Sequence, residues 1–138
     1  MAKRVISITE FDRQRLEELL AVAGDFEYRN RGDLKGFAEE LERGKLVDSK
    51  EVEPTVVTMN TRVRLRDLEA DEVMDYTLVF PRDADIEKGA ISVMSPIGTA
   101  ILGYSEGDII EWEVPDGKRR IKIEKILYQP EASGDYHL

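Results

Sequence analysis

The stretch GAISVMSPIGTAILGYSEGD, residues 89–108, places a strand, a helix start and a turn in close succession. Ile91 to Met94 form an apolar run of the kind that strands favour. Ser95 followed by Pro96 is the combination expected at the N-cap and first position of a helix. The next run, Ile97 to Leu102, stops at Gly103 and is long enough for only one or two turns. We therefore predict a strand over 91–94 and a short helix capped by Ser95.

A β-hairpin is predicted directly after this stretch. The runs Ile109–Val114 and Lys118–Leu127 flank Pro115-Asp116-Gly117, a composition typical of a tight turn. Apolar residues alternate in both runs, but the alternation loses its parity near the end of the second. Such a break indicates a bulge, which we place near Glu124 or Lys125.

Three further strands are predicted before residue 89, over Val56–Thr58, Arg62–Leu68 and Val73–Phe80. In the second of them, Val63 and Leu65 alternate with three arginines, so one face is apolar and the other basic. The basic face consists of Arg62, Arg64 and Arg66. It could bind RNA or an acidic protein surface, or it could be a solvated face whose arginines pair with acids on the adjacent strand.

The first 50 residues have helical periodicity instead. An apolar stripe with spacings of three and four residues follows Thr9, a good N-cap, and precedes Gly24, a common C-cap residue. The stripe is Leu16, Leu19, Leu20 and Ala23. We predict a helix over Thr9–Ala23 and a second, opened by Asp33 and fraying near Gly44. Two amphipathic helices joined by a short segment pair as an antiparallel hairpin.

The fold class is therefore α+β. Residues 47–54 have the composition of a connector and end in Pro54, so we set a boundary that gives a helical hairpin over 1–51 and a β-rich domain over 52–138. Residues 1–50 carry a net charge of -1 and the remainder -8. A total of -9 repels a phosphate backbone, so we expect no direct binding to duplex DNA.

Composition excludes several kinds of site. The chain has no cysteine, and its one histidine, His137, is too few for a histidine-based triad or a multi-histidine metal site. It contains neither a glycine-rich phosphate loop nor an apolar run long enough to span a membrane. We expect a monomeric cytoplasmic protein that is not an enzyme and has no catalytic residue, metal or cofactor.

The ordered set of strand, Ser-Pro, Ile-Gly, Ala-Ile-Leu-Gly and Gly-Asp in residues 89–108, followed by the hairpin, resembles the C-terminal domain of the Gre transcript-cleavage factors. The resemblance extends over about residues 52–138. It implies an FKBP-like antiparallel β domain with one short helix, which docks on core RNA polymerase at the rim of the secondary channel, while a short helical coiled coil points toward that channel.

The same resemblance suggests which residues contact the polymerase. They are Met94, Ser95, Pro96, Ile97 and Gly98, although many Gre sequences have an acid at the position of Met94. Gre factors stimulate cleavage with carboxylates at the tip of a longer coiled coil. The tip predicted here contains Asp25, Glu27, Arg29, Arg31 and Asp33.

We interpret this tip as non-catalytic. A helix over Thr9–Ala23 reaches only ~22 Å, and the two arginines oppose binding of a metal cation. We therefore expect a protein that competes with Gre cleavage factors without stimulating cleavage. The alternatives are a cleavage factor, a peptidyl-prolyl isomerase using Tyr76, Phe80, Trp112 and Tyr128, and a direct regulator of another enzyme. For the aromatic residues, the other interpretation is that they form the core of the sheet.

Overall fold

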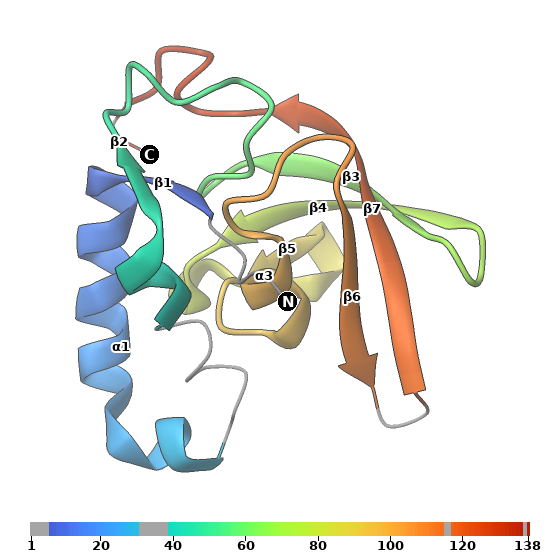
Figure 1. Cartoon of the computed structure of the whole chain (residues 1–138), viewed down its shortest axis with the longest axis horizontal. Helices are drawn as coiled ribbons and strands as arrows, with labels where there is room; N and C mark the ends of the chain where they lie inside the picture. The colour runs from blue at the N-terminus through green and yellow to red at the C-terminus, as the bar shows by residue number, and fades with distance from the viewer. Residues whose placement is uncertain (1–5, 31–38, 115–116, 137) are drawn as a thin grey trace.

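The computed structural model describes residues 6–30, 39–114, 117–136 and 138. The chain forms a mixed α+β fold in which a long helix lies beside a β-rich body (Figure 1). The elements in chain order are β1 (Ser7–Thr9), α1 (Glu10–Asn30), β2 (Lys45–Val47), β3 (Arg62–Asp67), β4 (Glu72–Val79), η1 (Pro81–Asp83), η2 (Ile86–Lys88), β5 (Ala90–Ser92), α3 (Pro96–Ile101), β6 (Ile109–Val114) and β7 (Gly117–Tyr128).

The main sheet has five strands in the order β5-β4-β3-β7-β6. All neighbours are antiparallel except β4 and β5, which are parallel. The predicted strands over 62–68, 73–80 and 91–94 and both strands of the final hairpin are present, with ends shifted by one or two residues. The predicted strand over 56–58 is wrong, because within it only Val56 pairs, in an isolated bridge to Ser105.

The predicted bulge in β7 is confirmed. Arg64 pairs with Lys125 while the next residue, Leu65, pairs with Ile123, which leaves Glu124 as the extra residue. A second shift lies between the pairs of Arg62 and Val63. The bulge explains how the apolar residues of β7 continue to face inward after the parity of the sequence changes.

Helix α1 is longer than the sequence indicated. It was expected to end at Ala23 with Gly24 as the cap, but it continues through Gly24 to Asn30. Its 21 residues span about 31 Å at 1.5 Å per residue. A glycine inside a helix costs about 1 kcal/mol relative to alanine, a cost that a long helix packed on a core can absorb. Of the second predicted helix, residues 39–43 are helical and 34–38 lie outside the described residues.

A small parallel sheet of β1 and β2 was not predicted. The Ser7 amide donates to the Gly103 carbonyl oxygen (3.3 Å), and the Lys45 amide donates to the Ile6 carbonyl oxygen (2.8 Å). A Cβ on Gly103 would lie 2.5 Å from Ile6 Cβ, so glycine is required for this approach. Gly103 thus allows the N-terminal strand to lie against the end of α3.

One continuous apolar core joins the helical and β-rich parts. Leu16 and Leu20 of α1 and Leu41 belong to the same buried cluster as Leu65 of β3 and Ile123 of β7. The root of α1 is therefore packed on the same core as the main sheet rather than on a core of its own.

Candidate functional site

The loop that leads into α3 is held by its own hydrogen bonds. The Ser95 hydroxyl donates to the Ser92 carbonyl oxygen (2.6 Å) and accepts from the Gly98 amide (3.1 Å). The Met94 amide donates to Ser92 Oγ (3.0 Å). Ser95 is thus the predicted N-cap, with Pro96 at the start of the helix. Three local hydrogen bonds therefore close the loop into α3.

Only part of this loop offers side-chain surface. Met94 is 9% exposed and belongs to the core, which gives a packing reason for an apolar residue at this position. A Cβ on Gly98 would lie 2.1 Å from the Ser92 carbonyl oxygen. Ser95 and Ile97 are half-buried and present the accessible side chains among the described residues of the loop.

The predicted tip residues are divided by the end of α1. Asp25, Glu27 and Arg29 lie on its last two turns, so they occupy helical positions and not a turn. Arg31 and Asp33, including the capping role expected for Asp33, lie outside the described residues. Of the five predicted tip residues, only Asp25, Glu27 and Arg29 therefore have a place in the described structure.

The three arginines of β3 share the outer face of the sheet, and two of them pair with acids on adjacent strands. Arg64 donates to both oxygens of Asp75 on β4 (2.9 and 3.2 Å). Arg66 donates to both oxygens of Glu124 on β7 (2.7 and 3.3 Å) and to Asp71 (2.8 Å). Arg62 is exposed. The ion-paired face that the sequence allowed for is present, with most of its charge compensated.

These ion pairs lower the pKa of the acids that take part in them. The hydrogen bond from Arg64 lowers the pKa of Asp75, and the hydrogen bond from Arg66 lowers the pKa of Glu124. The face therefore stays ionised at neutral pH as a ladder of paired charges.

The aromatic residues considered for an isomerase pocket have mostly structural contacts. Phe80 belongs to the buried core and Tyr76 packs against it. The Tyr128 hydroxyl donates to Asp135, which raises the pKa of Tyr128 to about 12. The side chain of Trp112 lies outside the described set. The core interpretation of Tyr76 and Phe80 is confirmed.

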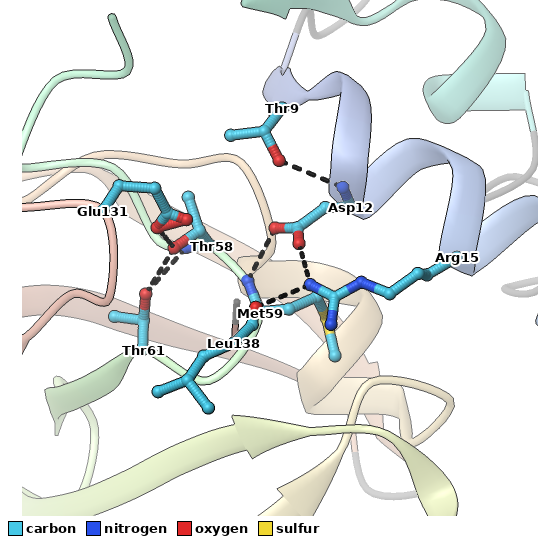
Figure 2. A network of polar contacts seen from close by, with 8 residues as sticks. All are labelled: Thr9, Asp12, Arg15, Thr58, Met59, Thr61, Glu131 and Leu138. Atoms are coloured by element: carbon cyan, nitrogen blue, oxygen red, sulfur yellow. Dashed lines mark hydrogen bonds and ion pairs between the residues drawn. The ribbon is translucent and has the colours of Figure 1, made fainter. Parts of the chain in front are cut away.

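A buried polar network, which was not predicted from the sequence, joins the start of α1 to the rest of the chain (Figure 2). The Thr9 hydroxyl accepts from the Asp12 amide (3.0 Å), as expected of an N-cap. The Asp12 carboxylate does not return to Thr9 N as in a capping box. It accepts from the Met59 amide (3.0 Å) and from Arg15 Nη2 (2.5 Å) instead.

The other half of the network joins Glu131, near the C-terminal end of the chain, to Thr58 and Thr61. The Thr58 hydroxyl donates to Glu131 Oε1 (2.6 Å), and Thr61 Oγ1 lies 2.8 Å from Thr58 Oγ1. Asp12 is 1% exposed and Glu131 8%. Burial raises the pKa of both carboxyls, against the lowering effect of their hydrogen-bond donors.

One sequence signal could have found the network. Asp12 precedes Leu16 and Leu20 by one and two steps of four residues, so an acid lies on the apolar stripe of α1. Such an acid is buried only when it has partners. The partners themselves, Met59 and the C-terminal residues, are too far along the chain for any periodicity to indicate.

A cleft of about 560 Å³ lies next to this network. Its lining includes Arg15, Leu19, Phe80 and Arg82. The Arg15 guanidinium stacks 3.9 Å from the centre of the Phe11 ring and 4.9 Å from that of Phe80. Arg15 is paired with buried Asp12, and Glu18 lies in the same lining as Arg82, so an acidic group accompanies each arginine of the cleft.

Within the described residues, no group of three or more His, Asp or Glu side chains is placed to hold a metal ion. The described helices also include none that is long and apolar enough to cross a membrane. His137 lies outside the described residues.

Comparison with known proteins matches residues 51–128 to the family described as "Transcription elongation factor, GreA/GreB, C-term". The Escherichia coli (strain K12) protein called regulator of nucleoside diphosphate kinase is 37% identical over 139 residues, covering the whole of both chains. GreA of Chloroherpeton thalassium is 43% identical over 83 residues, which are 60% of this chain and 52% of that protein. A solved GreA/GreB structure from Nitrosomonas europaea has 38% identity, a TM-score of 0.73, and coverage of 91% of this chain and 100% of its own.

Proposed function

Since this chain belongs to the GreA/GreB family of transcription elongation factors, we propose that it binds core RNA polymerase at the rim of the secondary channel. It regulates transcription there by competing with Gre cleavage factors, and it does not itself stimulate transcript cleavage. The observation that carries this proposal is the extent of the family match. Residues 51–128 include the main sheet and the loop into α3, whereas α1 precedes them.

The β-rich part is the proposed docking unit. We assign it an FKBP-like fold over residues 52–138, and we take 94–98 as the contact loop. The hydrogen bonds of Ser95 support this role, because a loop already fixed in one conformation loses little entropy when it binds. Ile97 and Ser95 supply the contact surface, while Met94 and Gly98 fix the shape of the loop.

Helix α1 and the helical residues 39–43 form the proposed arm, a short antiparallel coiled coil over residues 1–51. At about 31 Å, α1 is longer than the ~22 Å expected from the sequence. By its resemblance to the Gre factors, we still take it to be shorter than the coiled coil with which they stimulate cleavage. Its acids Asp25 and Glu27 are accompanied by Arg29 and Arg31, whose positive charge opposes a metal cation. The arm therefore blocks the channel entrance without delivering catalytic carboxylates.

The test uses stalled elongation complexes with a GreA factor and increasing amounts of this protein. We expect polymerase binding, displacement of GreA and slower cleavage of nascent RNA, with no cleavage when this protein is added alone. Acceleration of cleavage by the protein alone would show a true cleavage factor. Absence of both binding and displacement would contradict the docking proposal itself.

The name of the E. coli relative raises a second partner, nucleoside diphosphate kinase. We infer that any effect on this enzyme is exerted through transcription. Pull-down with the purified chain as bait separates the routes, since retention of polymerase alone supports transcriptional control. Retention of the kinase alone would support direct regulation.

A further inference from the structure

Two segments outside the matched region 51–128 meet at the same short turn. One is the first part of α1, and the other is the C-terminal segment, residues 129–138. Both contact the turn at residues 58–61, which precedes β3 in the β-rich part (Figure 2). The E. coli relative matches along the full length of this chain and so includes both segments.

The contact from α1 is made by a buried carboxylate. Asp12 Oδ2 accepts from the Met59 amide at 3.0 Å, while Oδ1 is held by Arg15 at 2.5 Å. A carboxylate that is 1% exposed is costly to remove from water, and it is retained only where several donors satisfy it. This contact fixes the first turns of α1 to the turn at 58–61.

The C-terminal segment holds the same region from another side. The Glu131 carboxylate accepts from the Thr58 hydroxyl at 2.6 Å. Gln129 Nε2 donates to the carbonyl oxygens of Glu53 (2.8 Å) and Val56 (2.7 Å), just before the turn. Gln129 and Glu131 are 2% and 8% exposed, so the segment is packed into the body rather than lying over it.

Arg15 connects the two segments directly. Its Nη2 donates both to Asp12 Oδ1 and to the Leu138 carbonyl oxygen (2.8 Å). Its guanidinium also lies between the rings of Phe11 and Phe80, which restricts its rotation. The root of α1, the turn at 58–61 and the C-terminal segment are thus joined in one network of hydrogen bonds.

We propose that the C-terminal segment is a clamp, acting through Gln129, Glu131 and Leu138, that fixes the direction of α1 relative to the β-rich part. The clamp sets where the arm points once the loop 94–98 is docked. This last consequence rests on the proposed function, whereas the fixed direction of α1 is a property of the free protein.

The free protein provides the first test. Because the chain has no cysteine, Ala21→Cys on α1 and Glu72→Cys at the start of β4 introduce two unique labelling sites at exposed positions. Electron–electron double resonance between spin labels on them should give one narrow distance distribution. In the same background Glu131→Ala removes the acceptor of Thr58, and Ser133→Ala changes an exposed residue of the same segment as a matched control.

We expect Glu131→Ala to broaden the distribution. The fraction of molecules outside the narrow distance range should increase about tenfold relative to the parent, since a hydrogen bond to a charged group is lost. Glu131→Gln keeps an acceptor oxygen and should restore the narrow distribution, and Ser133→Ala should leave it unchanged. A chain ending at Asp135 lacks the Leu138 contact but keeps Glu131, and it should show a smaller broadening.

The result that overturns the clamp is an unchanged distance distribution in both Glu131→Ala and the chain ending at Asp135, with a normal melting transition. If Glu131→Ala does not fold, the shorter chain decides the question alone. With polymerase, a variant that has lost the clamp should bind more weakly and displace GreA less well, because its arm has to be ordered on binding. Failure of polymerase binding by the unmodified chain would contradict the proposed function and leave the distance result standing.

Discussion

Single residues of the 92–98 segment show how a short motif builds a loop of defined shape. Ser95 caps α3, and Gly98 admits the Ser92 carbonyl oxygen where any side chain would collide with it. Most of the motif therefore builds the shape of the loop, and half-buried Ile97 and Ser95 supply its accessible side chains. A change at the buried positions should act on folding, and a change at Ile97 should act on binding.

Gly98→Ala should destabilise the protein by about 1–3 kcal/mol or more, because its Cβ must displace backbone atoms that lie within 3.0 Å. Thermal or urea unfolding measures the loss. Gly107→Ala is the comparison, since Gly107 has a positive φ but nothing within 4 Å of an added Cβ. Its cost should be limited to the backbone, about 1–2 kcal/mol. An equal or smaller loss at Gly98 would contradict the close approach.

Ile97→Asp should weaken polymerase binding, because Ile97 is the accessible apolar side chain in the proposed contact loop. If Ile97 is one of the minority of contact residues that dominate binding, its loss costs about 1 kcal/mol or more, which is about a fivefold or greater increase in Kd. Val73→Asp is the control, as Val73 is 45% exposed, lies near the start of β4 and is not part of the proposed contact loop. Equal binding by the two variants and the parent would exclude the loop as the contact.

At the scale of elements, α1 and the outer face of the sheet illustrate two different sources of stability. Helix α1 packs on the core at its root through Leu16 and Leu20 and continues past Gly24 to Asn30. Once the first turns are formed, each further residue adds one hydrogen bond, so the cost of about 1 kcal/mol for a single glycine does not have to end the helix. On the sheet, the pairs Arg64–Asp75 and Arg66–Glu124 place opposite charges on adjacent strands. They offset locally the repulsion among acids in a chain with a net charge of -9.

Gly24→Ala should raise the free energy of unfolding by up to about 1 kcal/mol, because alanine is favoured over glycine within a helix. A left-handed C-cap at this position would give the opposite sign, since alanine is strained at positive φ. Urea unfolding followed by circular dichroism distinguishes the two outcomes. Destabilisation would mean that α1 ends near Ala23 after all.

Acid should weaken the ion-paired face. The pKa values of Asp75 and Glu124 are lowered by hydrogen bonds from Arg64 and Arg66, so the folded state binds fewer protons than the unfolded state near their pKa values. The stability they contribute is present above the unfolded values of about 4 and is lost as pH falls through the lower folded values. A variant carrying Asp75→Asn and Glu124→Gln should lose less stability between pH 5 and 2.5.

Asp12 and Glu131 have the opposite sign, because burial raises the pKa of each carboxyl. Their contribution is fully present below the unfolded pKa and declines as pH rises through the folded value. For the ion-paired face, the contradicting outcome concerns the variant carrying Asp75→Asn and Glu124→Gln. If this variant and its parent lose the same free energy of unfolding as pH falls, the surface ion pairs do not account for the acid sensitivity.

For the whole molecule, the position of the arm is the property on which the proposed regulation depends. The loop 94–98 follows β5 of the main sheet, and the apolar core and the buried network hold α1 beside the β-rich part. A competitor of cleavage factors needs both parts in one arrangement, because binding at the rim alone would not place the arm at the channel entrance. The small sheet of β1 and β2 gives the arm a further attachment to the body through Gly103.

Local signals predicted much of this molecule. Ser95 before Pro96, the strands over 62–68 and 73–80, the final hairpin and the bulge at Glu124 all follow from neighbouring residues, and each is present. The signals failed where distant segments decide the outcome. Gly24 did not end α1, and residues 56–58 did not form a strand, although Val56 is buried.

The strands of the main sheet, the cap of α3 and the resemblance to the GreA/GreB family could all be predicted from the sequence, since alternation, capping and motif order are properties of contiguous residues. Only the tertiary structure decided how far α1 extends, that β1 pairs with β2, and that Asp12, Thr58 and Glu131 share one buried network. The pairing of β1 with β2 and the buried network join residues tens of positions apart. Their free energy comes from burial and from hydrogen bonds that exist only after the core has formed.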